Sequence, residues 1–109
     1  MSKKTPILPT DLASLPLEDD TEARQFVIRI GDHRARMEYD RSSDRIFLTG
    51  VNIPKAVVEQ GLSDPFIERV LSWVEENGLR LVPTHPAIKD YLRRNTAWQR
   101  LLLKGVQLR

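Results

Sequence analysis

The fold of this chain is decided by residues 53–86, which read IPKAVVEQGLSDPFIERVLSWVEENGLRLVPTHP. Between Phe66 and Val74 the apolar residues recur every three or four positions, which is the period of a helix with one buried face. Pro65 is tolerated in the first turn of such a helix, and Gly78 suits the left-handed residue that ends one. The apolar run 79–82 then predicts a short strand. A helix between two strands favours a parallel, right-handed crossover.

Three strands are predicted upstream of this stretch. Phe26, Ile28 and Ile30 alternate with other residues, and residues 35–39 alternate apolar with charged side chains. This is the period of a half-buried strand. Gly31 marks the turn between the two runs, and residues 41–44 form a second turn before the apolar run 46–49. Strands in such close succession form an antiparallel meander.

Two helices are predicted downstream. Pro86 begins the first, which carries Ile88, Tyr91 and Leu92, and Thr96 is placed to cap a last helix bearing Trp98. The predicted order is therefore βββ-α-β-α-α, an α+β fold with one parallel β-α-β crossover in a mostly antiparallel sheet.

Composition indicates one small domain. The chain has 109 residues and no cysteine, which excludes disulfides, thiolate metal sites and a cysteine nucleophile. The N-terminus lacks the apolar segment of a secretory signal, and no run is long enough to span a bilayer, so we expect a cytoplasmic protein. Residues 1–23 contain three prolines and no apolar period. We expect a flexible arm over 1–23 and a domain over 24–109.

The formal net charge of +2 combines an acidic arm with a basic body. A basic body can bind a polyanion, but a solvated mixed-charge surface explains the same composition. Five arginines decorate the predicted meander: Arg24, Arg29, Arg34, Arg36 and Arg45. Because no aromatic platform is interleaved with them, nucleic-acid binding is the least favoured function.

Several motifs together resemble a known family. They are Ile53-Pro54, Gly61-Leu62, the segment 77–83, the segment 91–95 and Trp98. Over about residues 25–103, the chain resembles the minimal single-domain branch of the GNAT superfamily of N-acetyltransferases, the YjdJ-like group. The resemblance implies a GNAT-like fold and transfer of an acetyl group from acetyl-CoA by direct attack of an amine.

The same resemblance implies where the coenzyme would bind. The backbone N–H groups of Gln60, Gly61, Leu62 and Ser63 would hold its pyrophosphate, with Ile53 and Asn95 beside the rest of the molecule. A glycine-containing loop before a helix can bind an anion in this way. The family's Arg-Gly-x-Gly aligns with residues 58–61, so its arginine and first glycine are absent here. In the alternative interpretation Gly61 is only a turn residue.

His85 takes the position of a cysteine in the family, between Thr84 and Pro86. A histidine titrates near neutral pH and can act as the general base that takes a proton from the amine. The alternative is a structural histidine that hydrogen-bonds a helix N-terminus. The acceptor would be a small-molecule amine or a protein lysine, and the protein a monomer or homodimer. The alternative function is a non-catalytic GNAT-like domain that binds a protein partner.

Overall fold

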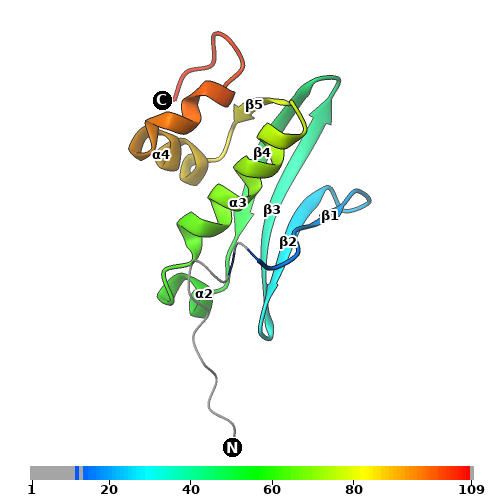
Figure 1. Ribbon diagram of the computed structural model, residues 1–109, viewed down its shortest axis with the longest axis vertical. Coiled ribbons are helices and arrows are strands. Elements are labelled where there is room, and N and C mark those ends of the chain that lie inside the picture. The colour runs from blue at the N-terminus through cyan, green and yellow to red at the C-terminus, as the bar shows by residue number, and fades with distance from the viewer. Residues whose placement is uncertain (1–11, 13, 109) are drawn as a thin grey trace, which may run out of the picture.

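The computed structural model describes residue 12 and residues 14–108 (Figure 1). The strands are β1 (Glu18–Asp20), β2 (Gln25–Ile30), β3 (His33–Ser42), β4 (Arg45–Asn52) and β5 (Arg80–Pro83). The helices are α2 (Lys55–Glu59), α3 (Ser63–Glu76), α4 (Pro86–Arg94) and the 3-10 helix η1 (Thr96–Leu101). None of the helices in these described residues is long and apolar enough to cross a membrane.

The strands form one mixed sheet in the order β1-β2-β3-β4-β5. Neighbours from β1 to β4 are antiparallel, whereas β4 and β5 are parallel. The predicted meander and the single parallel crossover are therefore confirmed. In Figure 1, α3 runs along one face of the sheet, and in the chain it lies between the parallel strands β4 and β5.

The core lies between one face of the sheet and the helices. Phe26, Ile28 and Ile30 of β2 are buried, as are alternate residues of β3, which is the periodicity that the sequence displays; Val27 of β2 is buried as well. The apolar stripe of α3 meets them, and the indole of Trp73 lies 4.8 Å from the Phe26 ring. Gly78 ends α3 with a φ of 65°, as its position predicted.

Three elements differ from the sequence expectation. β1 lies inside the stretch 1–23 that we expected to be a flexible arm, and it extends the sheet by pairing with β2. Residues 1–11 and 13 of that stretch lie outside the described residues. A short helix, α2, occupies the stretch we expected to be a loop after β4. The last helix is of the 3-10 type, and the side chain of Thr96 does not cap it.

Burial and acidic neighbours raise the pKa of both tyrosines. Desolvation, with a hydrogen bond to Asp19, raises the pKa of Tyr39 from 10.0 to about 12. Desolvation, with the charge of Glu68, raises the pKa of Tyr91 to about 12. Since these folded-state values exceed the unfolded ones, the tyrosines contribute stability that is complete below pH 10 and lost as pH rises through about 12.

We therefore expect the free energy of unfolding to fall between about pH 10 and pH 12. Ultraviolet absorbance of the phenolate, followed together with circular dichroism, measures this. The Tyr39→Phe variant should show a shallower fall. Titration of both tyrosines at their ordinary pKa in the folded protein would contradict the expectation.

Candidate functional site

The strand β4 continues beyond the point where its parallel partner leaves it. The paired register of β4 and β5 ends at Leu48 opposite Pro83, whereas β4 runs on to Asn52. Thr84 and His85 turn back, and their backbone N–H groups both donate to the carbonyl of Leu48. Among the described residues no strand pairs with residues 49–52 on that side, and we call this segment the free edge of β4.

A β-bulge lies at the start of the free edge. Glu38 and Tyr39 are consecutive in β3, yet they pair with Gly50 and Leu48, so Thr49 is an extra residue without a partner. Bulges bend a strand and increase its twist. The bulge therefore coincides with the place where β4 and β5 separate.

The hydrogen-bonding pattern indicates which backbone groups point toward the free edge. The N–H of Tyr39 donates to Arg24, on the side of β2. The backbone N–H and C=O groups alternate in direction along a strand, so those of Met37, two residues before Tyr39, also point to β2. Val51 is paired with Met37 and therefore forms no backbone hydrogen bond with β3. The N–H and C=O of Val51 thus point to the free edge.

The loop predicted to hold a pyrophosphate is the end of α2. The N–H of Gly61 donates to the carbonyl of Val58 at 2.9 Å, and the N–H of Leu62 donates to that of Val57 at 3.3 Å. Gly61 has a φ of 74°, and Val57 and Leu62 are both fully buried. This bond pattern is a Schellman motif, in which a left-handed glycine closes a helix. Gly61 therefore has the turn role that the sequence left as the alternative.

Most of the predicted backbone donors are thus engaged. The N–H of Gln60 also donates to Val57, at 3.2 Å, so Gln60, Gly61 and Leu62 all satisfy carbonyls of α2. Ser63 is the first residue of α3, and Asp64 is the second. The N–H groups at these two helical positions have no acceptor within α3. A coenzyme role for Gln60, Gly61 and Leu62 stays a prediction and requires the last turn of α2 to open.

An ion-pair network covers the start of α3. The residue preceding the helix is Leu62, and neither Ser63 nor Asp64 caps the helix with its side chain. Asp64 instead receives two hydrogen bonds from the guanidinium of Arg94, at 2.8 and 3.2 Å, and Arg94 also binds Asp90. The carboxylate of Asp64 in the first turn is favourably placed in the field of the helix. The network joins the start of α3 to the end of α4.

The two remaining residues of the predicted coenzyme site also make local contacts. Asn95 ends α4, and its side-chain amide donates to the carbonyl of Tyr91 at 2.9 Å. Ile53 follows β4 directly and packs against the core. Asn95 adjoins Arg94 and so lies near the start of α3, whereas Ile53 continues the free edge of β4.

His85 caps the N-terminus of α4. Its Nδ1 accepts a hydrogen bond from the backbone N–H of Ala87 at 3.1 Å. A ring nitrogen that accepts a hydrogen bond carries no proton itself, so the neutral imidazole of His85 bears its proton on Nε2. This is the structural role that the sequence left open for His85. The general-base role remains a prediction, and it requires Nδ1 to be released from Ala87 before it takes a proton.

We expect His85→Ala to lower the free energy of unfolding by about 1 kcal/mol, because the cap of α4 is lost. The His85→Asn variant is the matched control, since asparagine is among the best N-cap residues and should retain most of that stability. Chemical denaturation followed by circular dichroism measures both variants. Equal stability of the alanine and asparagine variants would exclude the capping contribution.

A model described as GCN5-related N-acetyl-transferase matches residues 25–101, which is most of the chain and includes the meander, the crossover and α4. No curated protein matches the chain. The matched range begins at the first residue of β2 and ends at the last residue of η1. The free edge of β4 and the start of α3 both lie within it.

Proposed function

This chain belongs to the GCN5-related N-acetyltransferase family, and on that premise we propose that it transfers an acetyl group from acetyl-CoA to an amine. The observation that carries the proposal is the free edge of β4. A strand edge with unpaired N–H and C=O groups can form hydrogen bonds with the amides of an extended ligand. The pantetheine arm of coenzyme A is extended and contains amide groups. We place it along residues 49–52, beside Ile53.

The pyrophosphate would then reach the N-terminus of α3. The N–H groups of Ser63 and Asp64 and the positive end of the helix favour an anion there. The carboxylate of Asp64 opposes it, although Arg94 neutralises much of that charge through its two hydrogen bonds. Opening the last turn of α2 would add the N–H groups of Gly61 and Leu62. In this proposal a local rearrangement of α2 on binding completes the set of backbone donors to the coenzyme.

The chemistry needs no covalent enzyme intermediate. A neutral amine attacks the carbonyl carbon of the thioester, the bond to sulfur breaks, and coenzyme A leaves as the thiolate while the amine nitrogen loses a proton. His85 lies at the start of the free edge, since its N–H donates to Leu48. If Nδ1 of His85 takes that proton, its cap on Ala87 must open during the reaction. If a group other than His85 is the general base, the hydrogen bond between His85 and Ala87 stays intact.

The Schellman motif of Gly61 favours a second candidate, a non-catalytic domain that binds a protein partner. In that case the last turn of α2 and the ion pair between Asp64 and Arg94 do not open, and coenzyme A does not bind. The two candidates differ in one property, which is affinity for acetyl-CoA.

Calorimetric titration with acetyl-CoA and with free coenzyme A tests the proposal. We expect saturable binding of both ligands, and release of free thiol when an amine acceptor is added. No heat of binding at millimolar acetyl-CoA would eliminate the acetyltransferase and leave the interaction domain. If binding is present, thiol release by His85→Asn decides between the roles of His85. The capped but non-basic variant should lose transfer only if His85 is the base.

A further inference from the structure

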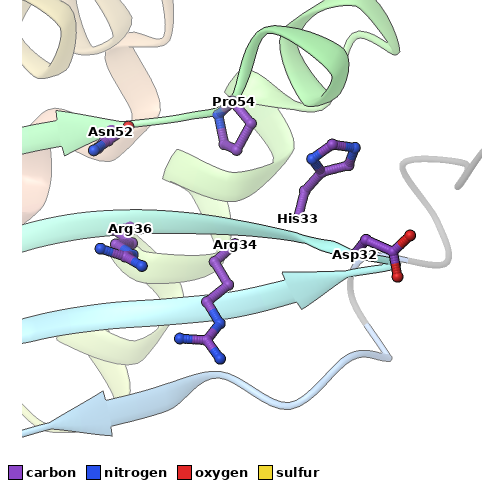
Figure 2. Close-up of a pocket in the computed structure, with 6 residues that line it drawn as sticks. All are labelled: Asp32, His33, Arg34, Arg36, Asn52 and Pro54. Atoms are coloured by element: carbon purple, nitrogen blue, oxygen red, sulfur yellow. The ribbon is translucent and has the colours of Figure 1, made fainter.

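The sheet face that points away from the core has a hollow near the turn between β2 and β3. A hollow of about 530 Å³ lies there, and Figure 2 shows the six side chains around it. They are Asp32, His33, Arg34, Arg36, Asn52 and Pro54. The hollow lies next to the free edge of β4, because its lining includes Asn52 and Pro54, which follow the bulge in the chain.

Arg34 and Arg36 point to the same face. They are two residues apart in β3, so their backbones are separated by about 7 Å, and the buried residues Ala35 and Met37 point to the opposite, core face. The register places Arg29 of β2 directly opposite Arg34, and Asn52 opposite Arg36. Three arginines therefore lie side by side at this end of the sheet.

The charges of Arg34 and Arg36 are not neutralised by an ion pair within the described residues. Within residues 14–108, no carboxylate forms an ion pair with Arg34 or Arg36, and Arg29 reaches only Glu18, at 3.5 Å. Like charges directly opposite each other across a strand pair destabilise a sheet. The pair Arg29–Arg34 is such an arrangement. An anion in the hollow would relieve this repulsion.

The chemistry of the lining selects the kind of anion. Two guanidinium groups offer paired N–H donors that match the oxygens of a phosphate, and the amide of Asn52 adds a further donor. The imidazole of His33 is the only aromatic ring among the lining residues, and no Phe, Tyr or Trp side chain offers the bases of a nucleic acid a stacking platform there. We propose that this hollow is a binding site for the phosphate group of a small molecule.

The phosphate can belong either to coenzyme A or to a phosphorylated amine acceptor. Both sources present the same group to Arg34 and Arg36, and both fit a hollow that adjoins the free edge of β4. The site itself does not depend on acetyl transfer, because inorganic pyrophosphate contains the recognised group. Pyrophosphate is therefore the probe.

Calorimetric titration of the full chain with pyrophosphate tests the site. The double variant Arg34→Gln, Arg36→Gln should bind at least about tenfold more weakly than the wild type, since two charged donors are lost. The matched control is Arg45→Gln, Arg80→Gln, which removes the same charge from two arginines that face each other across β4 and β5, outside the hollow. It should retain the wild-type affinity. Circular dichroism verifies that all three proteins are folded.

Two results would overturn the site: a wild type that does not bind pyrophosphate, or equal weakening in both double variants, which would mean that only total charge matters. Titration with coenzyme A then identifies the source of the phosphate. Weaker binding of coenzyme A by Arg34→Gln, Arg36→Gln assigns the site to the coenzyme, and unchanged binding excludes the coenzyme and leaves the phosphorylated acceptor. If acetyl-CoA does not bind the wild type at all, the proposed function fails while the pyrophosphate result stands.

Discussion

Replacing Phe26 with alanine is expected to lower the free energy of unfolding by about 3–5 kcal/mol. Phe26 is fully buried in β2, and its ring lies 4.6 Å from that of Tyr39 and 4.8 Å from that of Trp73. It thus joins two strands to α3, the helix of the crossover. Truncation removes those ring contacts and leaves a cavity that the sheet cannot close without bending. For a domain of this size the loss is a large part of the total stability.

The control is Phe47→Ala. Phe47 is only half-buried, and its partner in β3 is the exposed Asp40, so it lies on the face away from the core. We expect this variant to lose about 1–2 kcal/mol. Urea denaturation of both variants measures the difference. Equal losses would mean that the contact between the sheet and α3 does not hold the core together.

Replacing Val51 with proline is expected to weaken the binding of acetyl-CoA by at least about tenfold. The N–H of Val51 points to the free edge of β4 and makes no ladder bond with β3, so proline removes a donor to the ligand and none to the sheet. Proline is tolerated in a strand where the N–H faces away from a neighbouring strand. The variant should therefore fold, with a modest loss of stability because the side chain of Val51 packs against the core.

The Val51→Leu variant is the control, because it changes the side chain and retains the N–H. It should bind acetyl-CoA as the wild type does. Calorimetry gives both affinities, and thermal unfolding gives both stabilities. Unchanged binding by the proline variant would show that the coenzyme does not use this edge.

The sequence predicted the parts of the fold that have a strong period. The alternation of apolar residues along the chain predicted β2 and β3, and the apolar residues at helical spacing from Phe66 to Val74 predicted α3. Both patterns arise because one face of the element is buried. It did not predict β1, whose residues Glu18–Asp20 are all acidic and have low strand propensity. That strand exists because β2 offers an unpaired edge and Tyr39 donates a hydrogen bond to Asp19.

The sequence predicted part of the local structure around the candidate site, and the roles of its residues stay predictions. The sequence located the turn at Gly61 but not the helix α2 before it, which is too short to display a period. The apolar pair of Val57 and Leu62 on either side of the glycine is the signature of a Schellman motif and was available in the sequence. The bulge at Thr49 had no such signal, because it depends on the register of β3 against β4. The Asp64–Arg94 pair joins residues far apart in sequence and needs the packing of α4 on α3.

The central claim is that acetyl-CoA binds along the free edge of β4, and heteronuclear NMR of the backbone amides tests it most directly. With every amide assigned, acetyl-CoA is titrated and the resonance of Val51 is followed, with residues of β2 as the internal reference. We predict a saturable shift of the Val51 amide and of its neighbours in 49–53, together with Ser63 and Asp64 at the start of α3. Binding that leaves Val51 unshifted, or no shift of any amide at millimolar acetyl-CoA, would contradict this account.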